Sequence, residues 1–122
     1  LGDVYKRQVY RDTAIRLREQ DREAEKERRE RAWVAARAAA ELLRSRFHAT
    51  RVVVFGSLAR ENTSFTRWSD IDIAAWGLAE RDSLYALGDV MDMDTGFEMN
   101  LVDVNVCKLA ILESIAREGI DI

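Results

Sequence analysis

The chain has no proline, a single cysteine and a single histidine, and it has no long apolar run. One cysteine, Cys107, excludes a disulfide framework and is typical of a reducing compartment, so we expect a cytoplasmic protein. Cys107 and His48 alone do not form a zinc constellation. No apolar run approaches the roughly 20 residues that cross a bilayer, so we expect no membrane segment. The formal net charge of −3 leaves no basic excess, which argues against direct nucleic-acid binding.

The N-terminal part of the chain is rich in charge and contains nothing that breaks a helix. Residues 1–8, LGDVYKRQ, resemble a translated linker scar from library construction, so we set them apart from the fold; the alternative is a disordered natural N-terminus. Residues 9–31 predict a charged helical extension without an apolar stripe, and such a face is usually solvated. The alternative for this extension is an arm that contacts a second copy of the chain or another partner.

A single domain is predicted over residues 32–122, because apolar residues make up 48% of the sequence and follow regular periods. Helical spacing continues to Phe47, and strands are predicted at 52–55, around 70–76 and at 97–104. Further helices are predicted at 80–92 and 106–118, the last one capped by Asn105, with 120–122 as a short tail. This order predicts an α/β fold: a small mixed sheet of three or more strands, flanked by helices.

Residues 52–76, VVVFGSLARENTSFTRWSDIDIAAW, organise the rest of the chain. The buried strand ends at Gly56-Ser57, where a glycine can adopt positive φ and lets a bound group approach the main chain. We expect a first helical turn over residues 58–61, whose free N–H groups would bind phosphate. Asp70 and Asp72 are two residues apart in a strand and therefore share a face. Two adjacent carboxylates repel each other, and a divalent cation such as Mg²⁺ relieves the repulsion.

These motifs, Phe55-Gly56-Ser57 followed after a spacer by Trp68-Ser69-Asp70-Ile71-Asp72, resemble those of the DNA polymerase β-like nucleotidyltransferase superfamily. The extended pattern is most similar to its small stand-alone members, the minimal nucleotidyltransferases, and the resemblance covers about residues 32–122. It implies that Asp70 and Asp72 are catalytic metal ligands for Mg²⁺ or Mn²⁺. It also implies that ATP or another NTP is bound by four residues near the glycine turn: Gly56, Ser57, Arg60 and Ser69.

The third strand departs from the pattern of these relatives, in which a third carboxylate binds metal and accepts the proton of the acceptor hydroxyl. Asn100 stands at that position in Met99-Asn100-Leu101-Val102-Asp103. An amide oxygen can coordinate Mg²⁺, but it cannot accept a proton at neutral pH. Glu98 lies on the same face and is the candidate substitute, whereas strand alternation places Asp103 on the opposite face.

The resemblance implies transfer of NMP, with AMP the expected group, from an NTP to a hydroxyl on a partner protein. Similar domains act as antitoxins of HEPN-type ribonuclease toxins by modifying a tyrosine near the toxin's active site. The alternative is a weak or inactive nucleotidyltransferase-fold module that neutralises its partner by contact. Small-molecule transfer, as in aminoglycoside nucleotidyltransferases, is a third hypothesis, and the lack of a second domain argues against it. The base of the NTP, the acceptor and the oligomeric state, including a homo-oligomer through the N-terminal helix, stay open.

Overall fold

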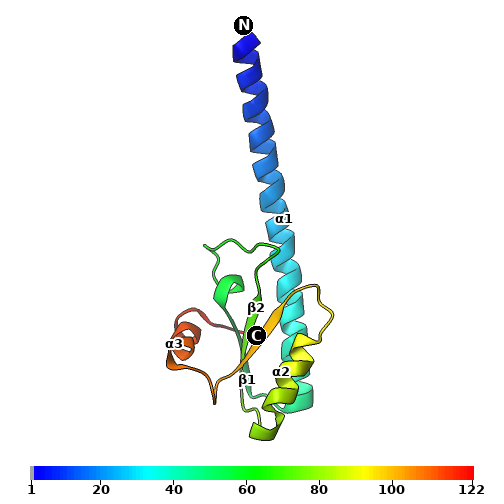
Figure 1. The fold of residues 1–122 in the computed structure, drawn as a ribbon, viewed down its shortest axis with the longest axis vertical. Coiled ribbons are helices and arrows are strands. Elements are labelled where there is room, and N and C mark those ends of the chain that lie inside the picture. The colour runs from blue at the N-terminus through cyan, green and yellow to red at the C-terminus, as the bar shows by residue number, and fades with distance from the viewer. Residues whose placement is uncertain (1) are drawn as a thin grey trace.

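The computed structural model of the protein describes residues 2–122. Its elements in chain order are α1 (Gly2–Phe47), β1 (Arg51–Phe55), the 3-10 turn η1 (Gly56–Leu58), β2 (Ile71–Trp76), the 3-10 turn η2 (Glu80–Asp82), α2 (Ser83–Met91), β3 (Met99–Asp103), α3 (Leu109–Glu118) and β4 (Ile120–Asp121). Helices and strands alternate around one sheet (Figure 1). The predicted α/β class with a small mixed sheet is therefore confirmed.

The sheet has four strands in the order β3-β2-β1-β4. β1 pairs antiparallel with both β2 and β4, and β2 pairs parallel with β3. The register sets Asp72 beside Phe55 on one side and beside Asn100 on the other. The ends of β1, β2 and β3 that carry the predicted site residues therefore meet at one edge of the sheet.

The two faces of the sheet are covered by different helices (Figure 1). The core face packs against α1 and α2, and its strand residues are fully buried and apolar: Val52, Val54, Ile71, Ile73 and Ala75. The site face packs against α3, where Val53 and Ala74 are buried with Ile115. Alanines of α1, such as Ala36 and Ala39, are 0% exposed, because small side chains let the helix approach the core face closely.

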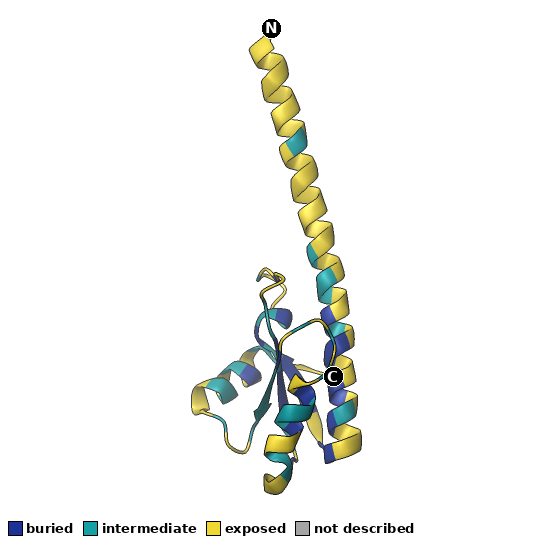
Figure 2. Ribbon diagram, turned by 45° about the vertical axis from the view of Figure 1, so that its right-hand side comes forward, coloured by how far each residue is buried: buried dark blue, intermediate teal, exposed yellow. Residues whose placement is uncertain are grey.

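α1 is much longer than the domain it covers. With a rise of about 1.5 Å per residue, its 46 residues span roughly 69 Å. Its buried residues begin only at Ala32, and residues 2–24 form an exposed arm that projects from the domain (Figure 2). The helix ends at Phe47, where His48 adopts a φ of 58°. None of the described helices combines the length and apolarity required to span a membrane.

Several boundaries differ from the sequence predictions. The helix continues through residues 2–8, which the sequence analysis had set apart, since nothing in them interrupts it. The helical turn expected over 58–61 is instead a 3-10 turn over Gly56–Leu58. The last helix begins at Leu109, and Asn105 does not cap it: its N–H donates to Asp103 Oδ1 at 3.0 Å in the turn after β3. The C-terminal tail forms strand β4.

Candidate functional site

The predicted metal ligands lie at the end of the site face where β2 begins. Asp70 immediately precedes β2, and Asp72 is its second residue. Ile71 and Ile73, which alternate with them, are 0% exposed in the core face. Asn100 lies beside Asp72 in the parallel pairing of β2 and β3. The strand alternation therefore brings the three predicted residues together, as the sequence indicated.

The Asn100 amide bridges the two carboxylates. Its Nδ2 group donates to Asp70 Oδ2 at 3.2 Å and to Asp72 Oδ1 at 3.4 Å. An amide N–H is a neutral donor, so it satisfies an oxygen of each carboxylate without balancing their charge. The pair therefore retains an electrostatic preference for a cation.

The environment of Asp72 disfavours its ionised form. Burial raises the pKa of Asp72 above its ordinary value of 3.8, and the hydrogen bond from Asn100 opposes the rise. The neighbouring charge of Asp70 raises the pKa further. Desolvation and a like charge are two of the general causes of a raised carboxyl pKa, and a divalent cation would reverse both.

Gly56 forms the turn that ends β1, and its φ of 74° confirms the predicted positive φ. A Cβ at this position would lie 2.3 Å from Asp72 Oδ2, so the glycine is required by space as well as by backbone conformation. The main chain at Gly56 and the Asp72 carboxylate are thus direct neighbours. The sequence predicts that a bound group approaches this glycine, and the neighbour that the structure places there is a carboxylate of the protein itself.

A carboxylate that the sequence analysis did not single out lies at the same turn. Glu118, the last residue of α3, accepts a hydrogen bond from Gly56 N–H through Oε1 at 3.1 Å. Its Oε2 is 3.6 Å from Arg60 Nε, and the Glu118 side chain is only 16% exposed. The sequence predicts that Arg60 contacts a phosphate, and here it pairs with the carboxylate at the end of α3.

Within residues 2–122, the remaining predicted residues make no side-chain hydrogen bond to Asp70, Asp72 or Asn100, and one of them lies away from the site. Ser57 is half-buried in η1. The hydroxyl of Ser69 accepts a hydrogen bond from Thr66 N–H at 3.0 Å in the turn before Asp70. Glu98 is exposed just before β3. Asp103 pairs with Ala75, which places it on the core face, as strand alternation predicted.

The loop between η1 and β2 is held by α1, a contact that sequence reasoning missed. Arg29 donates to the carbonyl oxygens of Leu58, at 3.3 Å, and of Arg60, at 3.2 Å, and it also binds that of Thr63. Arg28 donates to Phe65 O at 2.9 Å.

The same loop is anchored at Phe65. The ring of Phe65 is 0% exposed, and its N–H donates to Glu25 Oε1 at 2.6 Å. Part of the charged extension therefore positions the loop that carries Arg60. No periodicity predicts such contacts, because the partners are between 29 and 40 residues apart.

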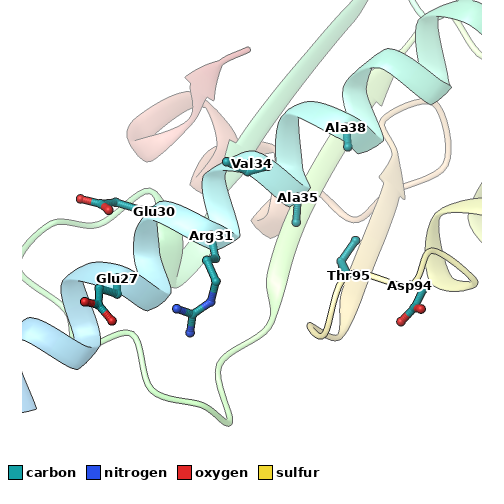
Figure 3. Close-up of a pocket in the computed structure, with 8 residues that line it drawn as sticks. All are labelled: Glu27, Glu30, Arg31, Val34, Ala35, Ala38, Asp94 and Thr95. Atoms are coloured by element: carbon teal, nitrogen blue, oxygen red, sulfur yellow. The ribbon is translucent and has the colours of Figure 1, made fainter.

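A separate hollow of about 570 Å³ lies between α1 and the loop that follows α2. It is lined by Glu27, Glu30, Arg31, Val34, Ala35, Ala38, Asp94 and Thr95. In Figure 3, Arg31, Ala35 and Ala38 point from α1 toward the side on which Thr95 lies. None of the predicted site residues lines this hollow, so its size does not argue for the nucleotide site.

The donor set at Asp70, Asp72 and Asn100 suits a hard cation that shares its ligands with a substrate. Among residues 2–122, no cluster of three or more acidic, histidine or cysteine side chains is arranged to hold a metal by itself. Mg²⁺ typically uses one or two carboxylates, waters and substrate phosphates. Two carboxylates and an amide beside the Gly56 turn fit that mode of binding and do not form a complete protein cage.

Comparisons with solved structures define the class of fold. Chains from two mutants of the MntA-HpeT toxin–antitoxin pair match with TM-scores of 0.57 and 0.56, at 18% and 20% sequence identity, and the match covers 70% of this chain in both. It covers 70% and 69% of those chains.

A third match is a chain from the complex of a tri-AMPylated Shewanella oneidensis HEPN toxin with its MNT antitoxin. Its TM-score is 0.55 at 17% identity, over 74% of this chain and 70% of that one. No family model and no curated protein sequence matches the chain. At these identities the likeness concerns the fold: the chain has the nucleotidyltransferase fold that the motifs around Gly56 and Asp70 predicted.

Proposed function

We propose that this protein is a metal-dependent nucleotidyltransferase that moves AMP from ATP to a hydroxyl on a partner protein, and that it serves as the antitoxin of a HEPN-type toxin. One observation carries the proposal: two carboxylates, Asp70 and Asp72, share one end of the site face with the positive-φ turn at Gly56. The fold of the toxin–antitoxin complexes supports the same class.

In this proposal Asp70 and Asp72 would hold Mg²⁺ or Mn²⁺, and the amide oxygen of Asn100 would be available as a further ligand. The bound ion would supply charge compensation for the triphosphate and the leaving pyrophosphate. Gly56 N–H and the Ser57 hydroxyl would bind phosphate oxygens, with Arg60 as a further donor. The raised pKa of Asp72 supports the proposal, because it shows that the ionised carboxylate is disfavoured beside Asp70. A bound cation would stabilise both ionised carboxylates.

The proton of the acceptor hydroxyl needs an acceptor of its own. Asn100 cannot take it, since an amide has no basic site at neutral pH. Glu98 precedes β3 on the same face as Asn100 by strand alternation, and it is exposed, so a docked partner could reach it. We assign Glu98 the role of general base in this proposal.

A second candidate is a module that binds its partner without transfer. It is favoured by two contacts within the site: the Asn100 amide bridges Asp70 and Asp72, and Glu118 accepts the hydrogen bond of Gly56 N–H. In that case the fold and the partner surface would neutralise a toxin by contact. In either proposal, the exposed residues 9–24 of α1 would be available to contact a second copy or a partner.

The test is the intact mass of a HEPN toxin incubated with this chain, ATP and Mg²⁺, with Asp72→Asn as the control. A mass gain of one or more AMP groups that the control lacks supports transfer. A stable complex without any mass gain supports the binding module and contradicts transfer. If neither a complex nor a mass gain is observed, the toxin–antitoxin proposal as a whole is overturned.

A further inference from the structure

Glu118 contacts two donors that the proposed function assigns to phosphate, Gly56 N–H and the Arg60 guanidinium. Its Oε1 accepts from Gly56 N–H at 3.1 Å, and its Oε2 lies 3.6 Å from Arg60 Nε. Carboxylate and phosphate oxygens accept hydrogen bonds from the same donors, and a main-chain N–H and a guanidinium are strong donors for both. A side chain of this protein therefore makes the contacts that a triphosphate would need.

The position of Glu118 is set by the packing of the chain end. Gly119 follows it directly, and a Cβ on Gly119 would lie 2.4 Å from Ile115 O and 2.6 Å from Val53 Cγ1. Gly119 N–H bonds to Ile115 O at 2.8 Å, and β4 then pairs with β1. The main chain at Glu118 is thus held against β1, and release of Gly56 requires a rotation of the side chain and no movement of α3.

The charge of Glu118 also acts on the neighbouring carboxylate. Gly56 N–H donates to Glu118 Oε1 at 3.1 Å, and a Cβ on Gly56 would lie 2.3 Å from Asp72 Oδ2. The carboxylates of Glu118 and Asp72 therefore lie on either side of the same glycine, and the Arg60 guanidinium opposes the charge of Glu118 at 3.6 Å. A phosphate that entered this group would meet unfavourable charge from Glu118 unless that side chain moved away.

We infer that Glu118 is an internal competitor of the nucleotide: its carboxylate must leave Gly56 N–H and Arg60 before phosphate oxygens bind there, and it thereby sets the affinity for the triphosphate. The inference rests on the proposed function, since it concerns the same site. It makes Glu118 a residue that determines affinity and not a ligand of the metal.

The test measures binding of tripolyphosphate, with Mg²⁺–ATP as a second ligand, by calorimetry. Glu118→Gln keeps the length and an oxygen acceptor for Gly56 N–H but removes the charge. We expect it to bind tripolyphosphate roughly three- to tenfold more tightly than the unmodified chain, the range that corresponds to the net free energy of one ordinary hydrogen bond. The matched control is Glu113→Gln, on the exposed side of α3, which should leave the affinity unchanged.

Two further variants separate competition from a structural role. Glu118→Asp keeps the charge on a shorter side chain and should show a smaller gain than Glu118→Gln. In an Arg60→Gln background, Glu118→Gln should increase the affinity for tripolyphosphate less, because Arg60 is one of the two donors for which Glu118 and phosphate compete. If Glu118 only held the turn in place, each substitution at residue 118 would weaken binding.

The outcomes distinguish this inference from the proposed function. Folded Glu118→Gln that binds tripolyphosphate no more tightly than the unmodified chain overturns the competition, even if Mg²⁺–ATP binds normally. Tighter tripolyphosphate binding by Glu118→Gln, without Mg²⁺–ATP binding in any variant, would support the competition for anions and contradict the proposed nucleotidyltransferase.

Discussion

The two faces of the sheet are built from the same strands but differ in composition: the core face is apolar, and the site face carries the carboxylates. Along β2, Ile71, Ile73 and Ala75 point to the core face and are fully buried, while Asp72 and Ala74 point to the site face. The core face is apolar along the whole length of the strand. The site face is apolar only under α3 and carries its carboxylates where α3 ends. Strand alternation thus lets one short strand contribute to the core and to the chemistry, and substitutions on adjacent residues should have opposite consequences.

The largest effect on stability is expected from the core face. Ile73→Ala removes a fully buried side chain between the sheet and α1. It should lower the free energy of unfolding by about 2–5 kcal/mol, because the lost burial adds to the remaining cavity. Urea denaturation measures this. An equal loss in Asp72→Asn, its neighbour on the site face, would break the comparison.

The turn at Gly56 should show a smaller effect on stability and a large one on binding. Gly56→Ala places a side chain at a φ of 74° and within 2.3 Å of Asp72 Oδ2. We expect a loss of about 1 kcal/mol or more together with loss of nucleotide binding. The matched control is Gly88→Ala in α2, where a Cβ meets nothing within 4 Å and should stabilise the helix by roughly 0.5–1 kcal/mol. A folded Gly56→Ala variant with normal ATP binding would show that the turn is an ordinary one.

Asn100→Asp sharpens the comparison, because it should lower the stability of the metal-free protein and raise the rate of transfer. The substitution removes the amide donor that bridges Asp70 and Asp72 and adds a third like charge, so the metal-free protein should unfold more readily. Transfer should rise by at least about tenfold, the cautious end of the range for general-base assistance. Initial rates of AMP transfer measure this, with the exposed Asn105→Asp as control. Glu98→Gln should remove the residual activity of the unmodified chain.

Two results would contradict this account of the third strand. A rate unaffected by both Asn100→Asp and Glu98→Gln would exclude both residues from proton transfer. A metal-free Asn100→Asp variant that is more stable than the unmodified chain would contradict the bridging role of the amide.

The smallest expected effect is a dependence on pH at Asp72. Because burial raises the pKa of Asp72, the fold loses stability as this carboxyl ionises. The difference in unfolding free energy between Asp72→Asn and the unmodified chain should therefore change in favour of the variant between about pH 4 and about pH 7. Denaturation at these two pH values, without divalent metal, measures it. A difference that is constant with pH would refute the raised pKa.

The parts of the site that could be predicted are those fixed by local geometry. Val52–Phe55 followed by glycine predicts a strand and a sharp turn, and the spacing of Asp70 and Asp72 predicts a shared face. Asn100 could be placed because the third strand has its own alternation. Each of these features depends only on the neighbouring residues in the sequence, and the structure confirms them.

The parts that could not be predicted depend on tertiary contacts. Glu118 reaches Gly56 across 62 positions of sequence, and Arg29 holds the loop from a helix segment that reads as solvated charge. Strand β4 has two residues, too few to show a period. Asn105 was wrongly assigned as a cap, since the helix begins only at Leu109 and Lys108 occupies the N-cap position.

The central claim is that Asp70 and Asp72 jointly bind a divalent cation with a nucleotide at the Gly56 turn. The direct measurement is calorimetric titration of Mg²⁺–ATP into the unmodified chain and into the double variant Asp70→Asn/Asp72→Asn, with circular dichroism to verify the fold. We predict metal-dependent binding to the unmodified chain and none to a double variant that is as stable or more stable, because the like-charge repulsion is relieved. Unchanged Mg²⁺–ATP affinity in the folded double variant would contradict the account.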